Sequence, residues 1–225
     1  GIGKEAAITI SNHNANVIIT GRNEKRLEET LEKLNGEKHI KIASDLTENE
    51  QREALADKVP EINGLVHCAG ITSHMPAKFL RQQDIDETFI INYNVPVLLT
   101  GLLLKKKKII NNSSIVFLSS IATRYPYFGG TLYGSTKSAI EAYSRVLALE
   151  FASKKIRSNC LSPSFVKTPM VDGAEKTISK EVLVKFEKMM PLGFGETKDV
   201  ANAIVFFLSD ASKWITGANL VMGGG

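Results

Sequence analysis

Short apolar runs alternate with amphipathic stretches along the whole chain, and this alternation constrains the fold more than any other feature. Strands separated by helices of roughly 10–20 residues form βαβ units, which require a parallel sheet. Right-handed crossovers then place helices on both faces of that sheet. We therefore predict an α/β fold with a doubly wound parallel sheet, whose ligands bind at the carboxyl ends of the strands. The predicted strands cover residues 17–20, 40–43, 64–67, 115–118, 156–161 and 219–222, and the predicted helices cover residues 24–34, 84–104, 132–151 and 199–208.

We predict a single domain over residues 1–225. A chain of 225 residues is long enough to bury a core of its own, and no change in composition marks a boundary. The one long insertion between predicted core elements covers residues 170–191 and mixes Lys and Glu with apolar residues. Long insertions near a site are often lids, so we predict a substrate lid there, with an ordinary surface helix as the alternative.

Composition and charge narrow the classes of function. A net charge of +4 does not indicate nucleic-acid binding, and the one basic run, Lys105 to Lys108, is explained as a solvated helix end near the C-terminal dipole. Two cysteines and four scattered histidines lack the spacing of a metal site. No apolar run reaches the ~18 residues that span a bilayer. We therefore predict a cytoplasmic protein that binds no metal, nucleic acid or membrane.

Tyr133, Lys137 and Ser120 are the most informative polar residues. Tyr133 and Lys137 lie four apart at the start of a predicted helix, so their side chains share one helix face. A free tyrosine titrates near pH ~10, and a nearby cation lowers that pKa, which suits the phenol to act as general acid or base on a carbonyl or alcohol. Ser120 ends the preceding apolar run. Its neighbour Ser119 is the alternative candidate, and its simpler role is to satisfy a backbone group at the strand end.

These three residues together resemble the catalytic set of the short-chain dehydrogenase/reductase family. The resemblance extends over the whole chain and implies a Rossmann-type sheet. It also implies an NAD(P)-dependent oxidoreductase that transfers a hydride between nicotinamide and a carbonyl or secondary alcohol. The other motifs that resemble the family's, in the same order, are Gly1-Ile2-Gly3, Gly21-Arg22-Asn23, Asp45-Leu46, Leu65 to Gly70, Asn92, Pro163 to Thr168, and Trp214 to Gly217.

Four departures from the family pattern concern cofactor binding. The chain begins inside the phosphate loop, so the first strand is missing, and we expect roughly two dozen further residues upstream that supply it. His67 and Cys68 replace two asparagines, Ser164 replaces a glycine, and Met222 stands where the family usually has an aspartate.

The resemblance implies a role for each catalytic position. Tyr133 exchanges a proton with the substrate oxygen, and Ser120 hydrogen-bonds the same oxygen. Lys137 lowers the tyrosine pKa and binds the nicotinamide ribose. Asn92 holds a water that links Lys137 to solvent, and the alternative for Asn92 is a helix amide that bonds to backbone.

The resemblance also implies contacts with the cofactor. Gly1, Ile2 and Gly3 lie where the backbone approaches pyrophosphate at a helix N-terminus. The further predicted contacts are Arg22, Asn23, Asp45, Leu46, Ala69, Gly70, Val166 and Thr168, with Tyr133 and Lys137. Arg22 can bond a 2′-phosphate and no acid follows it before Glu24, so we predict NADP over NAD, with a solvated loop arginine as the alternative. Asp45 has a helix-capping alternative, and Thr168 an alternative as a turn residue.

The sequence leaves the substrate open. The resemblance is broadly to the branch that reduces 3-oxoacyl thioesters carried on acyl carrier protein, and a polyol, sugar or steroid dehydrogenase is the alternative. A non-catalytic, regulatory dinucleotide-binding protein is a third alternative, which predicts a broken catalytic set. We also predict a homotetramer, because apolar residues on predicted helix 132–151 spread wider than one buried face needs. These residues are Ala139, Ile140, Tyr143, Val146 and Leu147.

Overall fold

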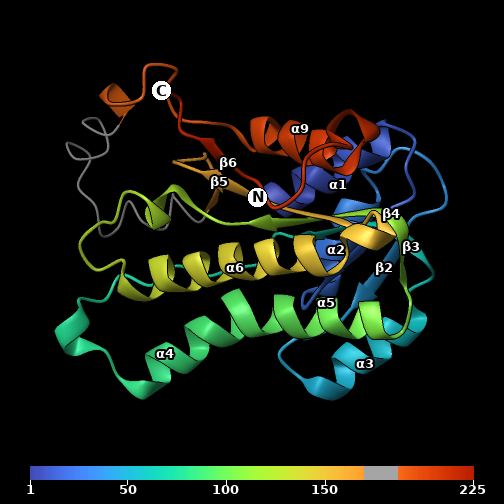
Figure 1. The fold of residues 1–225 in the computed structure, drawn as a ribbon, viewed down its shortest axis with the longest axis horizontal. Helices are drawn as coiled ribbons and strands as arrows, with labels where there is room; N and C mark the ends of the chain where they lie inside the picture. Colours follow the sequence, from blue (N-terminus) through green and yellow to red (C-terminus); the bar gives the residue numbers. More distant parts are fainter. Residues whose placement is uncertain (170–186) are drawn as a thin grey trace.

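The computed structural model describes residues 1–169 and 187–225, in which parallel strands lie between two layers of helices (Figure 1). Strands β3 to β6 pair in sequence order as a four-stranded parallel sheet, and β1 pairs with β2 in a separate parallel pair. This arrangement confirms the predicted α/β class with its parallel strands. The strands are β1 (Ile18–Gly21), β2 (Ile40–Ala43), β3 (Ile62–His67), β4 (Ile109–Leu118), β5 (Arg157–Pro163) and β6 (Asn219–Met222).

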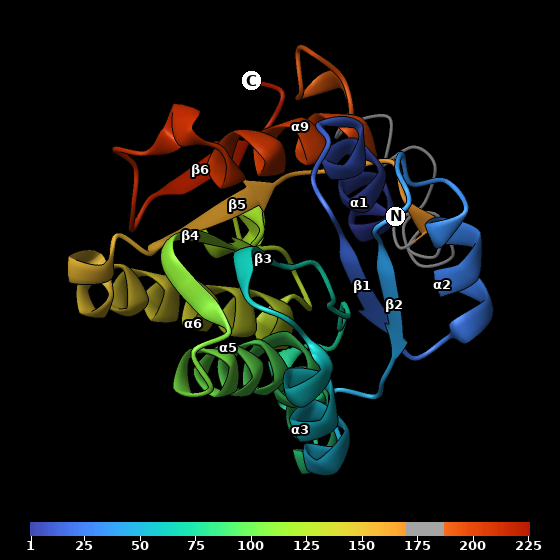
Figure 2. The same cartoon turned by 90° about the vertical axis from the view of Figure 1, so that its right-hand side faces the viewer.

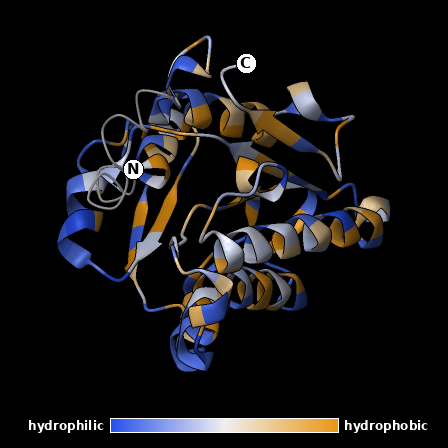
Figure 3. Ribbon diagram, turned by 90° about the vertical axis from the view of Figure 1, so that its left-hand side faces the viewer, coloured by the Kyte–Doolittle hydropathy of each residue, from blue (hydrophilic) through white to orange (hydrophobic). Residues whose placement is uncertain are grey.

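The helices cover both faces of the sheet. On one face α1 (Ile2–Asn12) packs along α9 (Thr197–Leu208), and the opposite face is covered by α3 (Asn49–Lys58), α5 (Val95–Lys105) and α6 (Thr131–Glu150) (Figure 1). Helix α2 (Glu24–Leu31) packs on β1 and β2. The strands are largely hydrophobic, whereas α2 is largely hydrophilic (Figure 3). This difference follows from burial of the sheet on both sides.

Strand β4 shows why this segment forms the centre of the core. Ile115 and Phe117 point to the cluster beneath α5 and α6, and Val116 and Leu118 point to the cluster beneath α9. All four side chains are at most 7% exposed. A strand with apolar side chains on both faces is stable only between two helical layers, so β4 must lie inside a doubly covered sheet.

The pair β1–β2 lies beside β3 but does not pair with it within residues 1–169 and 187–225 (Figure 2). Ile18 and Ile42 nevertheless pack against the same core cluster as β4. The two groups of strands therefore share one hydrophobic core. The expectation of a further strand upstream of Gly1 stays a prediction.

The predicted helix over residues 84–104 is interrupted. The structure has α4 (Gln82–Phe89), then a π-helical turn over Ile90–Asn94, then α5. The predicted long helix is thus confirmed as one helical stretch, Gln82–Lys105, but its π-helical turn was not predicted, because periodicity does not detect a single extra residue in a turn. Helices α1 and α3 begin near Gly1–Gly3 and after Leu46, where helix N-termini were expected without bounds, and the helix predicted over 24–34 ends at Leu31.

The continuous helical stretch Gln82–Lys105 is long and apolar enough to cross a membrane, by length and composition only. This finding corrects the expectation that no such stretch exists. Leu99 and Leu103 of this stretch are 3% and 2% exposed in the core cluster. A buried core helix of a soluble protein passes the same test, so the stretch is weak evidence for a membrane span.

Candidate active site

Ser120, Tyr133 and Lys137 meet at the carboxyl end of β4. Ser120 follows the strand directly and begins a 3-10 turn over Ile121–Thr123, where its hydroxyl accepts a hydrogen bond from Ala122 N at 3.2 Å. Tyr133 and Lys137 lie in the first two turns of α6. Lys137 Nζ donates to Leu118 O at 2.7 Å and lies 5.6 Å from the centre of the Tyr133 ring. The predicted catalytic set is thus held by one strand end and one helix.

Burial and Ser120 act in opposite directions on the pKa of Tyr133. Burial raises the pKa of Tyr133 above its ordinary value, and a hydrogen bond with the Ser120 side chain acts in the opposite direction. The Lys137 ammonium donates to Leu118 O and lies 5.6 Å from the centre of the Tyr133 ring. The expectation that Lys137 lowers the pKa of Tyr133 stays a prediction.

Lys137 is itself a buried cation. Its side chain belongs to a residue that is 5% exposed, and burial lowers its pKa to about 8, whereas the neighbouring Cys68 and Cys160 raise it. Within the described residues, its ammonium hydrogen-bonds to a neutral carbonyl, Leu118 O. The ammonium is therefore poorly compensated, as is common for groups in catalytic sites.

Asn92 lies in the π-helical turn, and its side chain is tied to backbone. Asn92 Oδ1 accepts from Ile71 N at 2.8 Å, while Nδ2 donates to Ile71 O at 2.9 Å and to Thr136 Oγ1 at 3.1 Å. These bonds match the predicted alternative, in which the Asn92 amide bonds to backbone. The backbone groups belong to Ile71 in the loop after β3 and not to the helix of Asn92 itself. Asn92 and Lys137 both lie next to Gly70. A Cβ built at Gly70 would lie 3.2 Å from Asn92 Oδ1 and 3.3 Å from Lys137 Nζ.

The glycines at the start of the chain lie at a helix N-terminus. Gly1 is the N-cap of α1, and Ile2 and Gly3 belong to its first turn. A Cβ at Gly1 would meet nothing within 4 Å, whereas one at Gly3 would lie 3.2 Å from Cys68 Cβ. Open space beside unpaired backbone N–H groups suits a pyrophosphate, so these residues fit the phosphates of a dinucleotide.

Four predicted cofactor contacts lie at the ends of β1 and β2. Arg22 is exposed, and its charge helps to lower the pKa of Asp45, after the larger effects of two hydrogen bonds from Thr47. Asn23 caps α2 by accepting from Arg26 N at 3.0 Å. Leu46 packs against the core.

Asp45 Oδ1 accepts from Thr47 N at 3.0 Å and from Thr47 Oγ1 at 2.8 Å. The carboxylate of Asp45 thus stabilises the loop that precedes α3. The alternative role predicted for Asp45 was to cap this helix, but the N-cap residue of α3 is Glu48.

The remaining predicted contacts lie on the loops after β3 and β5. Ala69 is exposed, and Gly70 and Thr168 are half-buried. Val166 is 6% exposed, with its side chain in the core beneath α9, so only its backbone can meet a carboxamide. The sequence did not show whether Val166 would contact the cofactor through its side chain or its backbone, and the structure leaves only the backbone.

Two residues near the site were missed in the sequence. Tyr127 packs its ring against Gly130, where a Cβ would lie 2.8 Å from the ring, and burial together with Tyr133 raises its pKa to about 12. Glu141 accepts hydrogen bonds from three hydroxyl groups beside Ser120. The spacing of Glu141, one turn after Lys137 on the same helix face, was the available signal.

Of the predicted lid over residues 170–191, residues 170–186 lie outside the described residues. At its described end, Leu192 N donates to Gly224 O at 2.9 Å, which ties this end to the C-terminal glycines. Within residues 1–169 and 187–225, no group of three His, Cys, Asp or Glu side chains could hold a metal ion.

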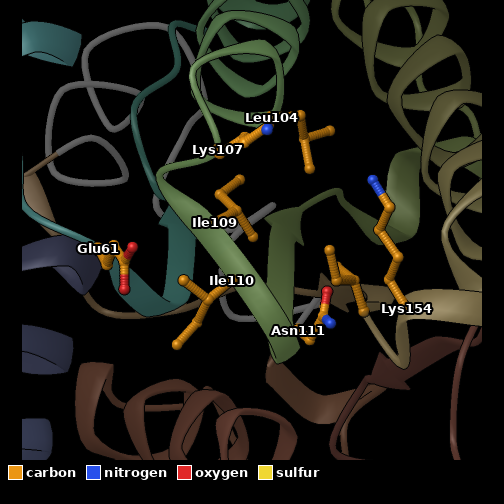
Figure 4. A pocket seen from close by; sticks show the side chains of 8 residues that line it. Glu61, Leu104, Lys107, Ile109, Ile110, Asn111 and Lys154 are labelled. Carbon is orange, nitrogen blue, oxygen red and sulfur yellow. The ribbon is translucent and has the colours of Figure 1, made fainter.

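A hollow in the surface lies at the other end of the sheet (Figure 4). It measures about 450 Å³, and its charged lining residues are Glu61, Lys107 and Lys154, beside Leu104 and Ile109. Ile109 begins β4, whereas Ser120 follows its end, so this hollow is remote from the predicted chemistry. We assign it no role.

A parallel sheet with a half-buried tyrosine, a buried lysine and a serine at its carboxyl edge fits a dinucleotide-dependent oxidoreductase. The whole chain, residues 1–225, matches a family model described as Enoyl-(Acyl carrier protein) reductase. It is 33% identical over 233 residues to L-xylulose reductase of Caenorhabditis elegans, covering 100% of this chain and 91% of that protein. It is 32% identical to the 3-oxoacyl-[acyl-carrier-protein] reductase FabG of Rickettsia felis, covering 100% and 92%.

Among solved structures, a short-chain dehydrogenase/reductase titled glucose/ribitol dehydrogenase from Brucella melitensis superposes with a TM-score of 0.91 at 28% identity. That match covers 100% of this chain and 91% of the other. The chain belongs to the short-chain dehydrogenase/reductase family. It is an NAD(P)-dependent oxidoreductase that interconverts a carbonyl and an alcohol.

Proposed function

We propose that Tyr133 is the general acid and base of this oxidoreductase and that Ser120, Lys137 and Asn92 support it. The observation that carries the proposal is the convergence of Tyr133, Ser120 and the buried Lys137 ammonium at the end of β4. Ser120 and Tyr133 would bind the substrate oxygen together, because the Ser120 side chain is close enough to Tyr133 to act on its pKa. The bound nicotinamide supplies or accepts the hydride at the neighbouring substrate carbon.

In this proposal Tyr133 is the proton donor in reduction. A buried phenol with a raised pKa is fully protonated at neutral pH, so it can bind a carbonyl oxygen as a hydrogen-bond donor. When the proton moves, the phenolate is stabilised by the Ser120 hydroxyl and by the Lys137 cation 5.6 Å from the ring centre. Asn92 would keep the Ile71 loop in place beside Lys137.

The preferred cofactor in this proposal is NADP. Among residues 1–169 and 187–225, no carboxylate lies within salt-bridge distance of Arg22. Glu24, the first acid after β1, lies 3.5 Å from Lys41 Nζ in an ion pair, and Glu28 pairs with the same lysine. Arg22 is thus free to meet a 2′-phosphate while the nearby acids are partly neutralised.

Two substrate classes follow from the relatives. A 3-oxoacyl thioester is supported by the relative from Rickettsia felis, and a sugar is supported by the relative from Caenorhabditis elegans. We propose the thioester first, as the family model also names an acyl-carrier-linked reductase. Turnover with acetoacetyl thioester against turnover with a ketose separates the two classes.

We further propose that the protein is a cytoplasmic homotetramer. Val146 and Leu149 on α6 are 51% and 81% exposed, and Leu98 on the neighbouring α5 is 49% exposed. Trp214, at 97% exposure, and Leu220 of β6, at 41%, expose a second apolar area. Two such areas on one chain suit two different symmetric contacts, which together give a tetramer.

The substitution Tyr133→Phe tests the central assignment. It removes the hydroxyl and keeps the ring, so turnover should fall by about 10²–10⁴-fold while binding of NADPH, measured by fluorescence, stays close to that of the wild type. Tyr143→Phe is a matched control on the same helix. The Tyr143 hydroxyl donates to Val97 O, at a distance of 3.3 Å, and takes no part in the proposed site. Tyr133 would not be the proton donor if its Phe variant kept more than about a tenth of turnover with binding intact.

A further inference from the structure

Glu141 lies on α6 one turn after Lys137, and its carboxylate gathers hydroxyl groups from three other segments. Its Oε1 atom lies 2.7 Å from Ser119 Oγ, 2.9 Å from Thr123 Oγ1 and 3.2 Å from Ser162 Oγ. Ser119 follows β4, Thr123 ends the 3-10 turn, and Ser162 belongs to β5. A carboxylate accepts several hydrogen bonds at once, so Glu141 joins four elements at the carboxyl end of the sheet.

Two of these hydroxyl groups stand on either side of Ser120. The Thr123 hydroxyl also lies 3.0 Å from Ser120 O, so its proton is shared between the turn and Glu141. The side chain of Ser120 is also tied to this turn, because its hydroxyl accepts a hydrogen bond from Ala122 N at 3.2 Å. The orientation of Ser120 toward Tyr133 therefore depends on a short turn that Glu141 holds at both ends.

A second arm of the network reaches β6. Ser162 Oγ lies 2.8 Å from Asn219 Oδ1, and Asn219 Nδ2 is buried without a hydrogen-bond partner in the described part of the chain. A half turn of this amide lets Nδ2 donate to Ser162 Oγ, which leaves the Ser162 proton for Glu141. All three hydroxyl groups can then donate to the Glu141 carboxylate, and hydrogen bonds to a carboxylate are stronger than those to a neutral amide oxygen.

We infer that Glu141 is a positioning residue for catalysis, which holds the Ser119–Thr123 turn so that Ser120 meets the substrate oxygen together with Tyr133. This inference rests on the proposed roles of Ser120 and Tyr133. Glu141 acts through Ser120 and touches neither substrate nor cofactor. Loss of its charge should thus slow turnover without changing affinity for the cofactor.

The test is a double-mutant cycle between Glu141→Gln and Ser120→Ala. The Gln variant keeps the shape of the side chain but weakens three charge-assisted hydrogen bonds, so kcat should fall about tenfold to hundredfold, as for a small misplacement of a catalytic group. KM and the Kd for NADPH should stay within about twofold of the wild type. Glu150→Gln, an exposed glutamate on the same helix, is the matched control and should keep full turnover.

The cycle separates positioning from a structural role. In the Ser120→Ala background, Glu141→Gln should cost at most about twofold in kcat, because the group that it positions is gone. Equal loss in both backgrounds would overturn the inference. If Ser120→Ala alone left turnover unchanged, the proposed role of Ser120 would fail instead, which is a distinguishable result.

A second variant keeps the test possible if the Gln variant does not fold. Thr123→Val removes one of the three hydroxyl groups and nearly conserves volume, so it should lower kcat in the same direction and again have little effect beside Ser120→Ala. Unfolding in denaturant, followed for every variant, detects loss of the native state. Full kcat in folded Thr123→Val and Glu141→Gln proteins would refute the inference.

Discussion

Lys137 provides a sharp test of the electrostatics of this site through the stability of the protein. Lys137 is only 5% exposed, and its ammonium donates to the neutral Leu118 carbonyl. Burial lowers its pKa from 10.5 to about 8. The perturbation is Lys137→Met, which keeps an unbranched chain of similar length and removes the charge.

The magnitude follows from linkage between protonation and folding. Between pH 8 and 10.5 the unfolded chain binds the Lys137 proton more tightly than the folded chain, so this group makes stability rise with pH. Below pH 8 the buried charge costs roughly 3 kcal/mol, and above pH 10.5 that cost has disappeared. Between pH 7 and pH 10 the wild type should therefore gain roughly 2–3 kcal/mol relative to Lys137→Met.

The assay is urea unfolding of both proteins without cofactor at pH 7, 8, 9 and 10. Groups that titrate in both proteins, such as Tyr127 and Tyr143, contribute equally and cancel in the difference. The unpaired Leu118 carbonyl left by Met adds an offset of about 1–3 kcal/mol that does not change with pH. A difference in unfolding free energy that is flat from pH 7 to pH 10 would show that Lys137 titrates normally and would refute the reasoning.

Two further predictions concern the cofactor and the assembly. Arg22→Asp should reverse a preference for NADPH over NADH of about tenfold or more, measured as the ratio of kcat/KM values, and equal efficiency of both cofactors in the wild type would contradict the role of Arg22. Leu149→Glu should convert the tetramer to smaller species in light scattering at micromolar concentration with little change in monomer stability, because Leu149 is 81% exposed. A wild type that is already monomeric at that concentration would exclude the tetramer.

The strands were predictable because their burial pattern is simple. Residues 40–43 and 219–222 were predicted with the bounds that the structure gives to β2 and β6. In β4 the prediction began at Ile115, whereas the strand begins at Ile109, since the polar stretch Asn111 to Ser114 interrupts the apolar run. Hydrophobic periodicity thus locates the core of an element better than its ends.

The predicted catalytic set could be located from spacing, but its electrostatics could not. Helical spacing places Tyr133 and Lys137 on one face, as the structure has them. The direction of the Lys137 ammonium depends on Leu118 O, a backbone atom that no sequence pattern indicates. The hydrogen bonds of Asn92 likewise reach Ile71, which is 21 residues away in the chain.

Two locally unfavourable features gather at the carboxyl end of the sheet. The buried ammonium of Lys137 and the π-helical turn that carries Asn92 each cost stability there. Neither of them is needed to build the core, which β4 completes with apolar side chains alone. Natural chains keep such conflicts mainly where function requires them, so their concentration around Ser120 and Tyr133 supports this end of the sheet as the site of the chemistry, independently of any sequence motif.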